Sequence, residues 1–185
     1  IPDIQNITKW KAGTLSQMFM KLTTRANQNK VAFSFSVGDL VQDATDAQFQ
    51  TAREAFQQFD DAGMPYAIVP GNHDYDSYTG DIPTDKRDTM YNKYFNYNDY
   101  KDLPTFGGAR VENNMVNTFH LFETSGVKYL LMALEDAPTK EVLDWADVVI
   151  SSHQDRRTII VTHDYFLRPT GNTVPKSTPG EAVWE

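Results

Sequence analysis

The stretch Tyr66-Ala67-Ile68-Val69-Pro70-Gly71-Asn72-His73-Asp74 is a short apolar run that ends at Pro-Gly and is followed by three polar residues. An apolar run of this length before Pro-Gly predicts a buried strand, 66–69, that leads into a tight turn. Asn72, His73 and Asp74 then lie at the carboxyl end of the strand, where ligands bind in an open α/β sheet. They offer an amide oxygen, a nitrogen that exchanges protons near neutral pH, and a carboxylate. A polar turn after a strand would explain these three residues equally well.

Three further segments favour a functional site over a simple polar turn. In each of them, a side chain that can bind a metal lies at the end of an extended run. The chain begins Ile1-Pro2-Asp3-Ile4-Gln5, which we expect to lie in a strand. The apolar run 31–37 leads into Gly38-Asp39, and the run 158–161 leads into Thr162-His163-Asp164. Four segment ends that supply Asp, Asp, Asn and His predict a metal site of oxygen and nitrogen ligands.

These segments resemble, in order, the motifs of the calcineurin-like metallophosphoesterase superfamily, which read D-x-H, G-D, G-N-H-D/E, H and finally G-H-x-H. The matching residues are Asp3-x-Gln5, Gly38-Asp39, Gly71-Asn72-His73-Asp74 and His163. The resemblance implies an α/β fold, an α/β/β/α sandwich of two mixed sheets flanked by helices, as one catalytic domain over residues 1–185. Gln5 stands where the family usually has His. The last motif is absent and a helix starts near 177–184, so we expect a domain that is incomplete at both ends and truncated at its C-terminus.

The resemblance also implies the chemistry, a two-metal hydrolysis of phosphoesters by a phosphatase or a phosphodiesterase. The residues that it assigns to the metals are Asp3, Gln5, Asp39, Asn72 and His163. Asp39 would bridge both ions, and a hydroxide between them would attack phosphorus. Mn, Fe, Zn and Ni all accept mixed carboxylate, amide and imidazole sites, so the ions are not identified. The implied partner is a phosphoester substrate.

His73 is the catalytic residue that the resemblance implies, as the group that protonates or stabilises the leaving oxygen. A nearby carboxylate, Asp43 or Asp74, would orient its ring. Asp43 is the weaker candidate, because relatives with an Asp in this turn have it where this chain has Gln42. An alternative function is a degenerate, non-catalytic module of the same fold that binds phosphate or a single metal, which Gln5 favours. Without G-H-x-H, we expect this chain by itself to bind metal weakly.

Composition narrows the possible functions. The chain has 185 residues, 40% of them hydrophobic, which is enough to bury one core. A net charge of -8 argues against a general binder of nucleic acid or of anionic membranes. No apolar run approaches the roughly 18 residues of a membrane span. The absence of cysteine excludes disulfides and thiolate metal sites. Relatives whose first motif reads P-D-x-Q are often exported, which suggests an extracytoplasmic location.

Hydrophobic periodicity predicts the elements between the motifs. We expect helices over 14–29, 46–61, 84–95 and 138–150, strands over 31–37, 66–69 and 158–161, and an antiparallel hairpin of 116–123 with 127–134. Thr45 and Gln48 have the spacing of a capping box at the second helix. The stretch 75–110, rich in Tyr, Asn and Asp, is either a functional lid or a packed surface excursion. His120 and His153 lie away from the strand ends, the first expected to be packed and the second solvated.

Overall fold

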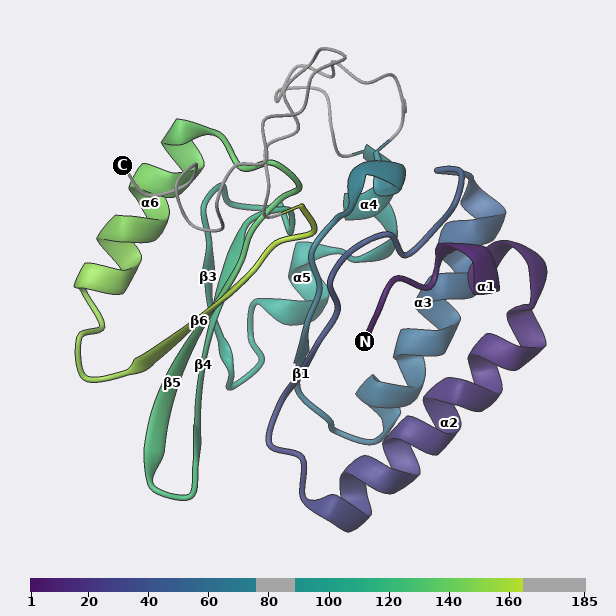
Figure 1. The fold of residues 1–185 in the computed structure, drawn as a ribbon, viewed down its shortest axis with the longest axis horizontal. Helices are drawn as coiled ribbons and strands as arrows, with labels where there is room; N and C mark the ends of the chain where they lie inside the picture. The colour runs from purple at the N-terminus through teal and green to yellow at the C-terminus, as the bar shows by residue number, and fades with distance from the viewer. Residues whose placement is uncertain (76–88, 165–185) are drawn as a thin grey trace, which may run out of the picture.

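The computed structural model describes residues 1–75 and 89–164, whose helices and strands form stacked layers (Figure 1). In chain order the elements are α1 (Gln5–Trp10), α2 (Ala12–Asn29), β1 (Ser34–Phe35), α3 (Asp46–Asp61), β2 (Tyr66–Ala67), a 3-10 turn (Asn72–Asp74), α4 (Thr89–Tyr94), α5 (Tyr97–Tyr100), β3 (Phe106–Ala109), β4 (Thr118–Thr124), β5 (Val127–Ala133), α6 (Lys140–Ser151) and β6 (Arg157–Val161).

The strands form two sheets. In sheet A, β1 pairs with β2 in parallel, with Ser34 opposite Tyr66. In sheet B the order is β3-β4-β5-β6, antiparallel for the first two pairs and parallel for β5 with β6. The hairpin between β4 and β5 turns at Ser125 and Gly126, both with positive φ, which matches the right-handed twist of the strands that it joins.

The first residues of the chain lie beside β1. The Ile1 amino group donates to Phe35 O at 2.7 Å, and Val37 N donates to Ile1 O at 3.1 Å. This alternation is the pattern of parallel pairing. The expected strand nevertheless stops early, because α1 begins at Gln5. The Asp3 carboxylate accepts from Gln5 N at 3.0 Å, which satisfies a free amide at the start of this helix.

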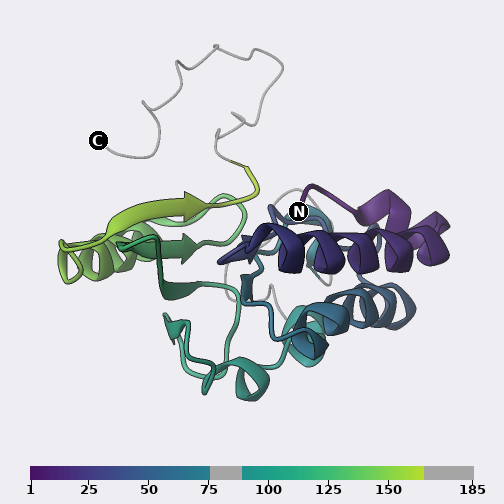
Figure 2. The same cartoon turned by 90° about the horizontal axis from the view of Figure 1, so that it is seen from below.

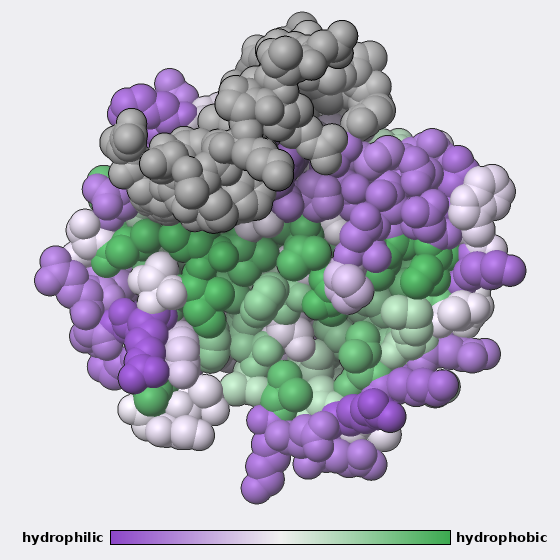
Figure 3. All heavy atoms as spheres, viewed as in Figure 1, coloured by the Kyte–Doolittle hydropathy of each residue, from purple (hydrophilic) through white to green (hydrophobic). Residues whose placement is uncertain are grey.

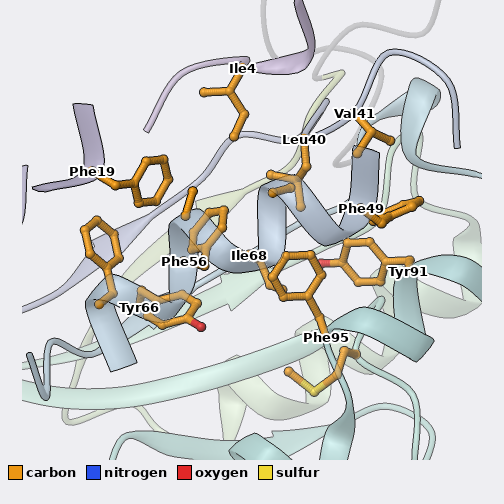
Figure 4. Packing of buried hydrophobic residues seen from close by; sticks show 14 of the residues in the cluster. Ile4, Phe19, Leu40, Val41, Phe49, Phe56, Tyr66, Ile68, Tyr91 and Phe95 are labelled. Carbon is orange, nitrogen blue, oxygen red and sulfur yellow. The ribbon is translucent and has the colours of Figure 1, made fainter. Parts of the chain in front are cut away.

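The largest apolar layer lies between sheet A and helices α1 to α5. It contains aromatic side chains from the helices and from β2, which pack closely in Figure 4: Phe19, Phe49, Phe56, Tyr66, Tyr91 and Phe95. The Phe19 ring lies 4.9 Å from Phe56 and 5.0 Å from Phe59, distances at which aromatic pairs attract. This layer fixes sheet A against α2 and α3.

Strand β5 contributes to two further apolar layers, one between the two sheets and one under α6, because its side chains alternate between the faces of sheet B. Leu131 and Ala133 pack in the layer between the sheets, with Ala67 of β2 and Val69, which follows that strand. Leu130 and Met132 pack under α6 on the opposite face. The sequence of layers is therefore helices, sheet A, sheet B and α6, as Figures 1 and 2 show from two directions. The expected α/β/β/α sandwich is confirmed.

The surface in Figure 3 has an apolar band across the region where β1 and β6 lie, bordered by hydrophilic residues. Ile160 of β6 is 39% exposed, and Phe33, Phe35 and Ile159 of the layer between the sheets are only partly buried. That layer is thus less completely covered than the aromatic layer under α2 and α3. Within the described residues, no helix has the length and apolarity that crossing a bilayer would need.

Most of the expected elements are confirmed. The helices expected over 14–29, 46–61 and 138–150 correspond to α2, α3 and α6, and Thr45 and Thr139 cap the last two. The expectation for the chain start was wrong from Gln5 onward, where α1 stands in place of a strand. The stretch 75–110 contains α4, α5 and β3 in its described part. Residues 84–88 of an expected helix and the helix start at 177–184 lie outside the described residues.

Candidate metal centre

The carboxyl ends of β1 and β2 meet through two glycines. A Cβ on Gly71 would lie 2.2 Å from Asp39 Oδ1, so only glycine allows this approach. Gly38 has φ +94°, and a Cβ there would lie 2.8 Å from both Gly71 N and His163 Nδ1. The G-D and G-N-H-D turns and the end of β6 therefore pack directly against one another.

Asp74 holds the two turns together. Its Oδ1 accepts from Leu40 N at 2.8 Å and from Val41 N at 3.0 Å, and its Oδ2 accepts from Gly71 N at 2.8 Å. Burial raises the pKa of Asp74 to about 7, against the lowering effect of these amides. Asp74 is one of the two carboxylates that the sequence predicts as orienting groups for the His73 ring. In the structure its carboxylate bridges backbone amides of both turns.

Asp39 lies at the centre of the site, with only 3% of its surface exposed. Its φ of 52° is in the left-handed region, which is uncommon for a residue other than glycine and concentrates at functional sites. Oδ1 accepts from His73 N at 3.0 Å, and Oδ2 lies 3.3 Å from His163 Nε2. The two turns thus hold the carboxylate in one orientation.

His163 reaches the site from the end of β6. Its Nδ1 donates to Val37 O at 2.7 Å, which leaves Nε2 directed at Asp39. Hydrogen bonding to Asp39 raises the pKa of His163 to about 9. An imidazole oriented through one nitrogen by a backbone carbonyl is the usual arrangement of a histidine that binds a metal through the other.

Asp3 and Gln5 flank Ile4, whose backbone N donates to Asp39 O at 3.2 Å. Gln5 Nε2 donates to Asp3 Oδ2 at 3.0 Å. Gln5 Oε1 is buried and has no hydrogen-bond partner among the described residues. A buried acceptor without a donor is costly, and a cation would relieve this cost. The donor set of carboxylate, amide and imidazole also fits such an ion.

The backbone N of His73 bonds to Asp39, and its ring contacts the loop that follows Asp39. Its Nδ1 lies 2.8 Å from Gln42 O and 3.2 Å from Gln42 Nε2. A carbonyl oxygen only accepts, so Nδ1 carries a proton and Nε2 is the nitrogen that exchanges one. The Gln42 carbonyl as an orienting group is a feature that the sequence did not predict.

Asp43, the other carboxylate expected near His73, is exposed. Its Oδ2 lies 2.7 Å from Lys9 Nζ and accepts from Gln48 Nε2 at 3.0 Å. The hydrogen bond from Lys9 lowers the pKa of Asp43. This carboxylate joins α1 to the start of α3.

The structure therefore brings Asp39, His163 and the His73 backbone into direct contact, and Asp3 and Gln5 flank the Ile4 amide that bonds to the Asp39 carbonyl. Asn72 lies in the same 3-10 turn as His73. Residues 1–75 and 89–164 contain no group of three or more His, Cys, Asp or Glu arranged to hold a metal. Two of the five expected ligands, Gln5 and Asn72, are amides, and the Asp3 carboxylate is bonded to Gln5.

Glu135 and Gln48 lie near the site, and the sequence does not predict a role for either residue there. Glu135 lies two residues after β5 and is 4% exposed, and its carbonyl accepts from Thr162 Oγ1 at 2.7 Å, beside His163. A polar residue directly after the apolar run 127–134 is the signal that could have identified it. Gln48 contacts the loop of Gln42, for which sequence spacing offers no signal. His120 is packed as expected, whereas His153 is partly buried and its Nδ1 donates to Val149 O at 2.8 Å.

Comparison with known proteins identifies the family of the chain. The family model of the calcineurin-like phosphoesterases matches residues 2–178, so the chain belongs to that family of phosphoester hydrolases. The uncharacterized protein YvnB of Bacillus subtilis (strain 168) is similar to it, with 27% identity over 173 residues. These residues are 91% of this chain and 13% of YvnB. The chain thus spans a small part of that relative.

Proposed function

We propose that residues 1–185 are the catalytic domain of a metal-dependent phosphoester hydrolase, a phosphatase or a phosphodiesterase, with Asp39 at the centre of a two-metal site. The observation that carries this proposal is the setting of the Asp39 carboxylate. It is buried, held by His73 N on one oxygen and opposed by His163 Nε2 at 3.3 Å on the other. A buried carboxylate in a backbone conformation with positive φ is a costly arrangement that function would explain.

The proposed ligands are Asp3, Gln5, Asp39, Asn72 and His163. Asp39 is the proposed bridge, because its two oxygens and its charge suit contact with two cations. The unpartnered Oε1 of Gln5 supports a role for this residue, although an amide oxygen replaces the imidazole of the family. The ions, when bound, supply Lewis-acid polarisation of the phosphoryl group and lower the pKa of water. Hard oxygen and imidazole donors suit Mn, Fe, Zn or Ni.

His73 is the proposed general acid. Its Nδ1 donates to the Gln42 carbonyl in both protonation states, so the proton lost to the leaving oxygen comes from Nε2. After transfer the neutral ring keeps the Nδ1 proton and the same hydrogen bond. Asp74 would act on His73 indirectly, by bridging the turns that carry Asp39 and Gly71. Asp43 would act through the loop beside the ring.

The test is hydrolysis of an activated aryl phosphate mono- and diester by the intact protein with added Mn. Asp39→Asn should lower turnover by about 10³-fold or more, because the bridging charge is lost. Asp155→Asn is the matched control, since Asp155 is an exposed acid paired with Lys128 before the start of β6. Near wild-type turnover of a metal-loaded Asp39→Asn protein would contradict the two-metal assignment.

A second candidate is a non-catalytic module that binds phosphate or one metal. Gln5 at the position of a family histidine favours it, because an amide is a weaker ligand than imidazole for transition metals. Calorimetry with inorganic phosphate and Zn separates the two functions. A single bound metal, together with phosphate binding and no turnover of either ester, would support the module and contradict the enzyme.

A further inference from the structure

We propose that Gln48 is a positioning residue for His73, acting through the peptide unit that joins Gln42 to Asp43. The inference rests on the proposed role of His73 for its effect on turnover. It concerns a residue of α3 that contributes no atom to the proposed metal site.

The argument starts from one planar peptide. Gln42 O and Asp43 N belong to the same peptide unit, so the direction of one sets the direction of the other. Asp43 N donates to Gln48 Oε1 at 3.0 Å, while Gln42 O accepts from His73 Nδ1 at 2.8 Å. Gln48 Oε1 also accepts from Gln42 N at 2.9 Å. The carbonyl that orients the ring is thus held from its far side by one glutamine side chain.

The Gln48 amide is itself held in one orientation. Its Nε2 donates to Asp43 Oδ2 at 3.0 Å, and the same oxygen pairs with Lys9 at 2.7 Å. A carboxylate only accepts, so the NH2 end of the amide faces Asp43 and the oxygen faces the two backbone amides. Lys9 belongs to α1, which begins two residues after Asp3. The network therefore links the first proposed ligand segment to the His73 loop.

The backbone of Gln48 is fixed by the start of α3. Thr45 caps the helix by accepting from Gln48 N at 3.4 Å, and the next residue, Phe49, is fully buried against the Tyr94 ring. In an ordinary capping box the Gln side chain would return to the Thr45 amide. Thr45 N instead donates to Asp43 O, which leaves the Gln48 side chain for the loop. A helix-anchored side chain can hold a ring more firmly than a loop alone.

The test uses three substitutions in the intact protein. Gln48→Leu removes both the acceptor and the donor, whereas Gln48→Glu keeps an oxygen that can accept from both amides and loses only the donor to Asp43, next to the Lys9 cation. Gln50→Leu removes an exposed glutamine of the same helix whose side chain bonds only to Glu54 among the described residues. The tautomer of His73 is measured by 15N NMR of protein labelled at histidine, with Zn, at alkaline pH where free imidazole is neutral. Turnover is measured on poor and good leaving groups.

In the wild type and in Gln48→Glu and Gln50→Leu, we expect the His73 proton on Nδ1. In Gln48→Leu, the ring should shift toward the tautomer mixture of free imidazole, and kcat on a poor leaving group should fall about tenfold with KM and metal content unchanged. A wild-type tautomer in Gln48→Leu, or an equal change in Gln50→Leu, would overturn the inference. The NMR measurement needs no activity. An inactive wild type with this tautomer change would therefore refute the proposed function and support the role of Gln48.

Discussion

Gly71 packs against Asp39 so closely that a Cβ at position 71 would lie 2.2 Å from Oδ1 and 2.3 Å from the Asp39 amide nitrogen. The carboxylate therefore occupies space that any other residue at 71 would fill. The same carboxylate accepts from His73 N, two residues after the glycine. The G-N-H-D turn thus shapes the site in two ways. His73 N donates a hydrogen bond to the carboxylate, and Gly71 has no side chain that would displace it.

Gly71→Ala should displace Asp39. We expect the free energy of unfolding to fall by about 1–3 kcal/mol from overpacking and turnover to fall about 10²-fold. Chemical denaturation and an aryl phosphate assay measure the two effects. Gly13→Ala is the control, because Gly13 lies in α2 with no atom within 4 Å of an added Cβ, and alanine favours a helix. It should be neutral or stabilising, and equal losses in both variants would argue against a special approach at Gly71.

Gln5 should set metal affinity. We expect Gln5→Leu to weaken binding of Zn about tenfold or more, because the unpartnered Oε1 is removed. Gln5→His should bind Zn at least as tightly as the wild type, because imidazole is a good ligand for this ion. Calorimetric titration of the intact protein gives both affinities. Unchanged affinity in Gln5→Leu would remove Gln5 from the ligand set.

His73→Asn should separate chemistry from metal binding. The proposed acid gives its Nε2 proton to the leaving oxygen, so its loss should lower turnover about 10²- to 10⁴-fold on poor leaving groups and less on good ones. Metal content, measured by elemental analysis, should be unchanged. Loss of metal in this variant would instead make His73 a ligand and end its assignment as an acid.

The sequence predicts those parts of the fold that local patterns encode. The apolar spacing of α2, α3 and α6 and the strand-end positions of Asp39 and His163 are such patterns, and both residues meet at 3.3 Å in the structure. The start of α1 was not predicted, because Ile1 bonds to Phe35 and Val37 as a residue of a parallel strand would. The Asp3 carboxylate then accepts from Gln5 N and opens a helix.

The partners of the polar side chains could not be predicted in the same way. The sequence places Asp74 beside His73, yet its oxygens accept from Leu40, Val41 and Gly71 amides. Those amides come from a turn 33 or 34 residues earlier as well as from its own turn. Side-chain bonds to distant backbone depend on the packed geometry of both turns. These side-chain bonds therefore cannot be predicted from periodicity or spacing in the sequence.

His120 gives the last prediction, which concerns stability and pH. It is 3% exposed in β4, between the rings of Phe33 and Phe106, and its Nε2 lies 3.2 Å from Thr118 Oγ1. Burial lowers the pKa of His120 to about 3, whereas an unfolded histidine titrates near 6.5. Between these values the unfolded chain binds the extra proton. The stability from His120 is therefore complete above about pH 6.5 and is lost as the pH falls toward 3.

The measurement is the difference between two curves of unfolding free energy against pH, one for the wild type and one for His120→Leu. Leu is close to His in size and cannot bind a proton, while the carboxylates that titrate in the same range cancel in the difference. We expect the wild type to lose about 1.6 kcal/mol more than the variant between about pH 6.5 and 5, since the slope rises from about 0.7 kcal/mol per pH unit, where half of the unfolded histidines carry the proton, toward about 1.4. Parallel curves would mean that His120 takes up its proton in the folded protein as readily as in the unfolded chain, contrary to its burial.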